Sequence, residues 1–394
     1  ETTANLIEFY THAFQGLTSP NQTKVNLSPQ NQIWWLKEAF NFVSLAGFAM
    51  FILALARFLI TLPFFKEAVV PVPEVVTAPK TRNGKILSWI IVILATLLPA
   101  IFFPALFNKS AAGMTPLLYG TYAIMALAAL WILVTWVRSK EEAKTVTVQG
   151  IVIAVFAFLL AMWILRAPNL LPLGRMYNQP TTNQIAYWGV ASGLIAALIN
   201  VVVYYLDRKK QGTTFASYGL VFKPMVIVAS LLAALLTVVL GYVVLWIMQA
   251  LFTVDFRLWT LAVRSFKVEH VLTAIRYLPY FFVFYLINVI VVNVNSRGMK
   301  KWGNLTAIAL NIGGLVLWLA RQYGLLFIRG VAAHPAENLN AIVLFALVPI
   351  LGAAAIYSRK LFEETGNVWL AAFLNTLLFT MITAANTAMF WNFI

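Results

Sequence analysis

The sequence has no cysteine and little charge, and both deficits limit what the chain can be. Without cysteine there is no disulfide, no thiolate metal site and no cysteine nucleophile. Charged residues make up only 10% of the 394 residues and hydrophobic residues 61%, whereas soluble domains are about a quarter charged. Together with a mean hydropathy of +0.83, this excludes a soluble enzyme, a disordered tail and a fibrous repeat. Most of the chain is expected to lie in lipid.

Catalytic and cofactor-binding motifs are also missing. The sequence contains no G-x-S-x-G nucleophile elbow, no H-E-x-x-H pair, no P-loop and no dinucleotide fingerprint. Its three histidines are scattered. We therefore expect no cofactor, no metal and no catalytic residue in this chain. The pair Glu363-Glu364, beside Arg359 and Lys360, is interpreted as a solvated turn.

What the sequence does contain is a series of long apolar runs. A membrane-spanning helix needs about 20 mostly apolar residues, and ten stretches meet this requirement, although nine or eleven spans remain open. The predicted spans are 40–62, 86–107, 115–137, 147–165, 184–206, 225–251, 277–294, 303–320, 340–357 and 367–391. The sequence thus predicts an all-α, polytopic bundle over 40–394, preceded by an N-terminal segment over 1–39.

The positive charges predict the orientation of this bundle. The net charge is +15, which in a membrane protein indicates basic cytoplasmic loops rather than nucleic-acid binding. Loops that follow odd-numbered spans are the more basic set and include Arg208-Lys209-Lys210 and Lys300-Lys301. We therefore expect a multi-pass protein of the plasma membrane with both termini extracytoplasmic. An outward N-terminus of this length needs an upstream signal or span, and the first residue is Glu1, so we expect a longer protein.

Ionisable groups are almost absent from the predicted spans. All 13 carboxylates lie outside them, whereas ion-coupled pumps usually keep an ionisable group in the membrane. Only Arg57 lies within a span, near its predicted cytoplasmic end, where its alkyl stem lets the charge reach the interface. This pattern weakens a transport hypothesis.

The last predicted span carries a stripe of neutral polar residues. Its threonines recur at intervals of four, three and four residues, which places them on one helix face, and two asparagines border that face. The set is Asn375, Thr376, Thr380, Thr383, Asn386 and Thr387. Because hydrocarbon cannot satisfy hydroxyl and amide groups, we expect the stripe to face the bundle interior. It is either a hydrogen-bonded seam between helices or the lining of a polar cavity.

Small residues recur at helical spacing in two other spans. The span 184–206 has Gly189, Ser192 and Gly193, and the span 225–251 has Ser230, Ala234, Thr237 and Gly241. Small residues let helix backbones approach closely, so these faces are predicted to be packing faces.

The segment 252–276 differs from the other loops because it mixes aromatic residues with charges and contains no glycine or proline. This composition suits an amphipathic helix in the headgroup plane. Arg264 and Lys267 are three residues apart and would share a helix face toward lipid phosphates. The candidate headgroup or substrate contacts are Arg257, Arg264, Lys267 and His270; the alternative is a solvated connector helix.

Three stretches carry a family resemblance. Asn31 to Glu38, Thr253 to Trp259 and Leu361 to Trp369 resemble the C-terminal membrane region of bacterial, mainly Gram-positive, alpha/beta-hydrolase proteins. The resemblance implies a hydrolase domain upstream of Glu1 that would contain the catalytic triad. Residues 2–14, which have the pattern of an amphipathic helix, would then end that domain.

Three hypotheses follow. The chain is the membrane domain that anchors an extracytoplasmic hydrolase and presents lipid or acyl substrates to it, a stand-alone transporter or channel for a small solute, or an intramembrane enzyme acting on lipid-linked substrates. In each case the lipid bilayer is the expected partner.

Overall fold

The computed structural model describes residues 2–13, 34–76, 82–110, 114, 179–206, 208–214, 216–299 and 301–388. The predicted spans 115–137 and 147–165 lie outside these residues. The described part of the chain has eight helices that are long and apolar enough to cross a membrane, and each corresponds to one of the other eight predicted spans. The protein is therefore an all-α helical bundle of the polytopic membrane class.

The helix bounds extend the predictions at most ends. The short helix α1 (Thr2–Ala13) agrees with the prediction for the N-terminus. The spanning helices are α2 (Trp34–Leu59), α3 (Arg82–Ile101), α7 (Pro180–Leu206), α8 (Pro224–Phe252), α9 (Val268–Ser296), α10 (Gly303–Arg329), α11 (Asn338–Thr365) and α12 (Trp369–Thr387).

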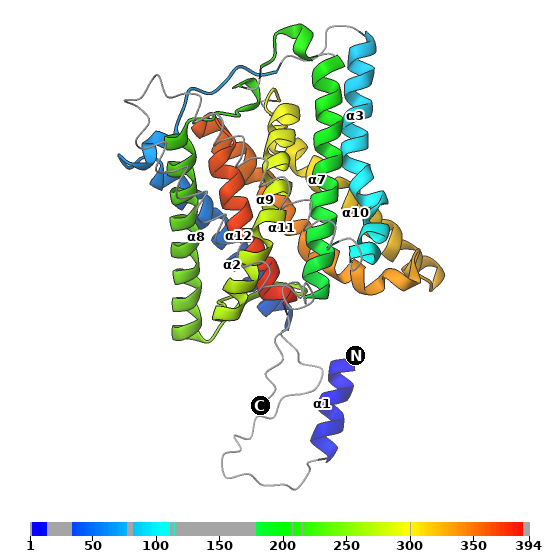
Figure 1. Cartoon of the computed structure of the whole chain (residues 1–394). Coiled ribbons are helices and arrows are strands. Elements are labelled where there is room, and N and C mark those ends of the chain that lie inside the picture. The colour runs from blue at the N-terminus through cyan, green and yellow to red at the C-terminus, as the bar shows by residue number, and fades with distance from the viewer. Residues whose placement is uncertain are drawn as a thin grey trace.

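Helix α12 lies at the centre of the bundle, between α8, α9 and α11 (Figure 1). It is the most buried of the eight helices, and it is apolar or neutral on every side, as expected for a helix surrounded by protein. On the far side of α9, helix α7 packs against α9 and α3, and α10 packs against α3 and α11. The outer helices α2, α3 and α8 expose long apolar side chains, as lipid-facing helices do.

The two predicted packing faces are confirmed. Ser230, Ala234 and Thr237 of α8 are completely buried, and a Cβ atom at Gly241 would collide with Ile52 of α2. On α7, a Cβ atom at Gly193 would come within 3.3 Å of the Phe284 Cα atom of α9. The small side chains therefore set the close approach of these helix pairs.

One end of the bundle is closed by the segment that joins α2 to α3. Asn367 is fully buried in the turn between α11 and α12, and its Nδ2 atom donates to the Ala68 carbonyl at 2.7 Å. The Val70 N–H donates to the Thr365 carbonyl at 2.9 Å. Gly366 has a φ of +69°, and a Cβ atom there would collide with the Val70 carbonyl. The turn thus requires glycine, both for its backbone conformation and for the contact with residues 68–70.

The interpretation of Glu363-Glu364 as a solvated turn is wrong. Helix α11 continues to Thr365, and both carboxylates are half-buried and ion-paired. Glu364 pairs with Arg57 at 2.5 Å, and Glu363 pairs with the buried Arg359 at 2.9 Å. The pattern was misread because the partners come from α2 and from the preceding turn of α11.

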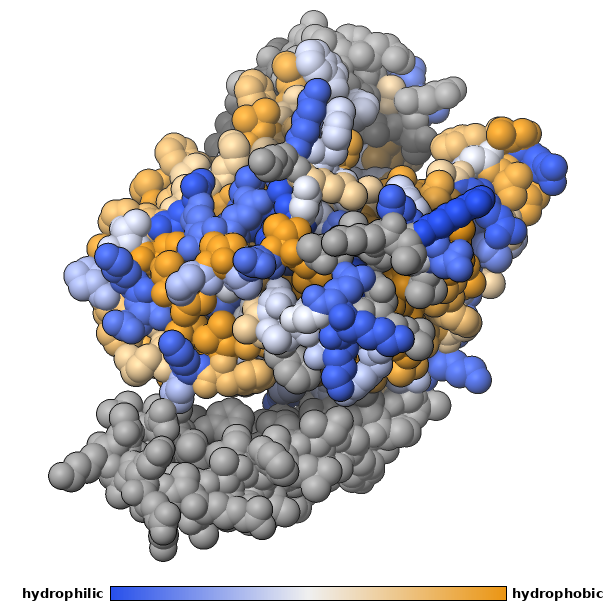
Figure 2. Space-filling view, turned by 90° about the horizontal axis from the view of Figure 1, so that it is seen from above, coloured by the Kyte–Doolittle hydropathy of each residue, from blue (hydrophilic) through white to orange (hydrophobic). Residues whose placement is uncertain are grey.

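This end also carries many of the basic residues, including Lys66, Arg208-Lys209-Lys210 and Lys301. Seen from this end, many hydrophilic side chains are visible, with hydrophobic ones between and around them (Figure 2). The hydrophilic side chains suit an end of the bundle that contacts water.

Candidate functional site

At the opposite end, the connection between α8 and α9 corrects the prediction of an amphipathic helix over 252–276. Helix α8 ends at Phe252, and residues 256–263 form a β-hairpin of β1 (Phe256–Leu258) and β2 (Leu261–Val263), after which α9 begins at Val268. The strands are antiparallel, with Phe256 opposite Val263.

A contact distant in sequence stabilises this hairpin. The Ala262 N–H donates to Asn386 Oδ1 at 3.0 Å, and Asn386 Nδ2 donates to the Ala262 carbonyl at 2.7 Å. The amide of α12 thereby pairs with the backbone of β2 as a neighbouring strand would. All three residues of β2 are buried, so the hairpin is fixed against the end of α12.

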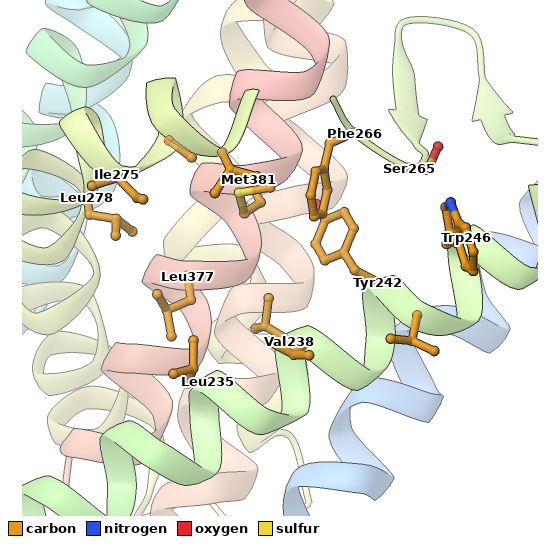
Figure 3. A pocket seen from close by; sticks show the side chains of 14 residues that line it. Leu235, Val238, Tyr242, Trp246, Ser265, Phe266, Ile275, Leu278, Leu377 and Met381 are labelled. Atoms are coloured by element: carbon orange, nitrogen blue, oxygen red, sulfur yellow. The ribbon is translucent and has the colours of Figure 1, made fainter. Parts of the chain in front are cut away.

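Between α8, α9 and α12, below the hairpin, lies an apolar groove of about 440 Å³ (Figure 3). Its walls are almost wholly apolar. It is lined by Leu235, Val238, Val239, Tyr242, Val243, Trp246, Ser265, Phe266, Val271, Ala274, Ile275, Leu278, Leu377 and Met381.

The groove opens toward the lipid-facing side of the bundle. Val239, Trp246 and Ile275 line it and are nevertheless 49%, 65% and 51% exposed. These residues lie on helices that are long and apolar enough to cross a membrane, and an opening at such a position suits contact with lipid. With a rise of 1.5 Å per residue, the α8 wall from Leu235 to Trp246 is about 16 Å long. That length is close to one leaflet, which is half of the roughly 30 Å hydrocarbon core.

A polar cavity of about 630 Å³ lies beyond the end of α8. Ser265 and Phe266 line both this cavity and the apolar groove, so the two spaces are neighbours. The remaining residues of the polar cavity are Gln249, Thr253, Val254, Asp255, Arg264, Lys267, Glu269, His270 and Ala388. The Ser265 hydroxyl donates to Gln249 Oε1 and ties the loop to the last turn of α8.

Three of the four candidate headgroup contacts line this cavity. Arg264 is half-buried, and one guanidinium nitrogen donates to the Ala385 carbonyl at 2.7 Å, which anchors it to α12. Lys267 is exposed, and its backbone N–H donates to His270 Nδ1 at 3.1 Å. Arg264 and Lys267 lie in the loop before α9, and His270 lies on the first turn of α9. The prediction that Arg264 and Lys267 share a helix face is therefore wrong.

The fourth candidate, Arg257, lies on β1 and does not line the cavity. It pairs with Asp255 at 2.9 Å, so it offsets one of the two carboxylates at the cavity wall. The remaining charges that line the cavity are Arg264 and Lys267 against Glu269, which favours an anionic group. Among the described residues no cluster of histidine and carboxylate side chains suits a metal ion.

The polar stripe of α12 faces the bundle interior, as its spacing predicts. Asn375, Thr376, Thr380 and Thr383 are at most 4% exposed. Asn375 Nδ2 donates to Ser358 Oγ of α11 at 3.0 Å. The Thr376 hydroxyl donates to the Ala372 carbonyl of its own helix, and Thr380 Oγ1 has no hydrogen-bond partner among the described residues. None of the four residues lines the apolar groove or the polar cavity.

The two outer members of the stripe serve other contacts. Asn386 binds the hairpin, and the Thr387 hydroxyl lies 2.7 Å from that of Thr182 on α7. Leu374 and Leu378, on the opposite side of α12, are also buried, so they pack against protein.

Sequence reasoning missed the groove itself. Helix α8 is apolar on all sides, so no periodicity distinguishes the face formed by Leu235, Val239, Tyr242 and Trp246 from the others. Tyr242 and Gln249, the polar groups on that face, are spaced seven residues apart. This spacing was the available sign that one side of the helix differs.

Comparison with known proteins adds no family to this description. No family model, no curated protein and no solved structure matches the chain. A function for this protein is therefore proposed from the geometry of the described residues alone.

Proposed function

We propose that this protein binds one membrane amphiphile from the bilayer, with its hydrocarbon chain in the apolar groove and its phosphate-bearing headgroup in the polar cavity. The observation that carries the proposal is that the groove and the polar cavity are neighbours that share Ser265 and Phe266 in their walls. An apolar groove next to a polar cavity that contains Arg264 and Lys267 has the same order of chemistry as a phospholipid.

The headgroup contacts decide which amphiphile is retained. A hydrocarbon chain gains little by leaving other lipid tails for an apolar groove, because both environments are equally apolar. Arg264 and Lys267 offer donors to a phosphate, and a guanidinium matches phosphate geometry in a bidentate manner. By the predicted orientation the cavity lies on the extracytoplasmic side, so the ligand would come from the outer leaflet.

The proposal is tested by filling the groove. Val239→Trp places a bulky ring in the opening of the groove. The matched control is Val316→Trp, because Val316 lies on α10, is 42% exposed and does not line the groove. Native mass spectrometry of the purified chain, titrated with dipalmitoyl phosphatidylglycerol, should show a saturable single adduct for the wild type and for Val316→Trp. The Val239→Trp variant should lose it. Equal adducts on all three proteins would contradict the proposal.

We also propose that the bundle anchors an extracytoplasmic hydrolase to which it presents such an amphiphile. The support is the resemblance of three stretches of sequence and the predicted outward N-terminus. The proposal is tested by the coding sequence that precedes Glu1, which should encode a G-x-S-x-G elbow between a strand and a helix. An upstream sequence without one would remove this proposal and leave lipid binding untouched.

A further inference from the structure

Another charged groove lies at the end of the bundle opposite the polar cavity, beside the last turn of α2. Its volume is about 760 Å³, and its walls contain two cations, Arg57 and Lys66, and one carboxylate, Glu364. The other residues that line it are Ala54, Phe58, Ile60, Thr61 and Val69. The groove therefore has one positive charge in excess between walls that are otherwise mostly apolar.

Both cations are positioned by the end of α11 and the turn that follows it. Arg57 Nε pairs with Glu364 Oε1 at 2.5 Å, and the Arg57 side chain still remains 54% exposed. Lys66 lies two residues before Ala68, whose carbonyl accepts from the buried Asn367 Nδ2 at 2.7 Å. The Lys66 side chain is exposed and forms no ion pair with the described residues. The site is thus arranged before a ligand binds, which lowers the cost of binding.

The order of the groove walls follows the order of a membrane surface. Ala54 and Phe58 are four residues apart on one face of α2, and both are exposed. Helix α2 is long and apolar enough to cross a membrane, so this face suits lipid chains, and Arg57 and Lys66 lie where the headgroups begin. By the predicted orientation this end is cytoplasmic, and the cytoplasmic leaflet is the one with a negative surface potential.

We propose that this groove binds the phosphate group of an anionic phospholipid from the cytoplasmic leaflet. Arg57 pairs with Glu364 through Nε, and a guanidinium has four further N–H donors on its terminal nitrogens, which match a phosphate. The Lys66 ammonium adds a charge that no carboxylate among the described residues offsets, and the first part of the lipid chains lies against Ala54 and Phe58. The site is independent of the proposed function, because it shares no residue with the groove between α8, α9 and α12 or with the polar cavity.

The experiment uses a phosphatidylglycerol with a diazirine in its headgroup, because the position of the adduct separates this site from the one at the other end. The full chain is reconstituted in phosphatidylcholine vesicles that contain a minor fraction of this probe. After irradiation, peptide mass spectrometry should place adducts on residues 54–69. Lys66→Gln should lower their yield about fivefold, which corresponds to one cation at a membrane surface, and Lys66→Arg should keep it.

The matched control is Lys301→Gln, which removes an exposed charge at the same end from a residue that does not line the groove, and it should keep the yield. Excess glycerol 3-phosphate should lower the yield no more than sodium chloride of equal ionic strength does, because it has no chains to lie against α2. If glycerol 3-phosphate abolishes the adducts, the groove takes a soluble phosphate and the lipid assignment is wrong. No adducts on residues 54–69, or equal yields from the wild type and Lys66→Gln, would overturn the site and leave the proposed function untouched.

Discussion

The most informative perturbation of the polar cavity is the removal of its anchored cation by Arg264→Gln. The guanidinium is half-buried and held by the Ala385 carbonyl at 2.7 Å, so it is already positioned before a ligand binds. A hydrogen bond between a charged group and its partner contributes about 1.5–3 kcal/mol. Loss of one such contact to a phosphate should therefore weaken binding at least about tenfold.

Lys267 provides an internal comparison. Its side chain is exposed, and exposed ion pairs contribute only about 0.2–1 kcal/mol because water and salt screen them. Lys267→Gln should weaken binding about two- to fivefold, and this smaller effect should shrink further as the salt concentration rises. Arg329→Gln is the matched control, because Arg329 is exposed at the end of α10 and does not line the cavity, and it should bind close to the wild type.

The assay is competitive binding of dipalmitoyl phosphatidylglycerol and dipalmitoyl glycerol, which lacks the phosphate. The wild type should prefer the phospholipid at least about tenfold, and Arg264→Gln should remove most of that preference while its affinity for dipalmitoyl glycerol is kept. Melting curves of each variant verify that the fold persists. If Arg264→Gln loses both lipids equally, or loses neither, the cavity does not select a phosphate.

Four further predictions concern the bundle. Thr380 Oγ1 is buried with no hydrogen-bond partner among the described residues. Thr380→Val should therefore change the free energy of unfolding by less than about 0.5 kcal/mol or stabilise the protein, and a loss of stability above about 1 kcal/mol would mean that the hydroxyl has a partner. Asn367→Ala should destabilise the protein by roughly 2–6 kcal/mol, because it leaves the Ala68 carbonyl and the Trp369 N–H buried and unpaired; a melting curve like that of the wild type would refute this. In intact cells an impermeant thiol reagent should label Val254→Cys but not Ser217→Cys, and the reverse pattern would invert the predicted orientation. The purified chain should show no esterase turnover, and activity that disappears with one serine of this chain would overturn the absence of a catalytic site.

The sequence predicted those parts of the fold that depend on local composition. Runs of about 20 apolar residues identify spans because backbone groups in lipid must be satisfied within the helix. The spacing of Thr376, Thr380 and Thr383 placed them on one face of α12 because helical periodicity is a property of neighbouring residues. That face is buried, but so is the opposite one at Leu374 and Leu378. The packing faces at Gly193 and Gly241 followed from side-chain size alone.

The parts that could not be predicted depend on distant residues. The hairpin at 256–263 replaces the expected helix because Asn386, which is 124 residues away, satisfies the backbone of Ala262. No local pattern of residues 252–276 contains that information. The groove could not be predicted from the sequence either, because it is formed by three helices whose apolar faces look alike in sequence. Only the neighbouring polar cavity contains charges, and these identified Arg264 and Lys267 as candidates.

The central claim is that a lipid chain occupies the groove between α8, α9 and α12, and site-resolved photo-cross-linking tests it most directly. The full chain would be reconstituted in vesicles with a phosphatidylglycerol that carries a diazirine in the middle of one acyl chain. After irradiation, peptide mass spectrometry should place the adducts on 235–246 of α8, on 271–278 of α9 and on Met381 of α12, and Val239→Trp should abolish them. Adducts spread equally over the exposed faces of α2, α3 and α10 would show that the lipid contacts the bundle everywhere alike and would contradict the account.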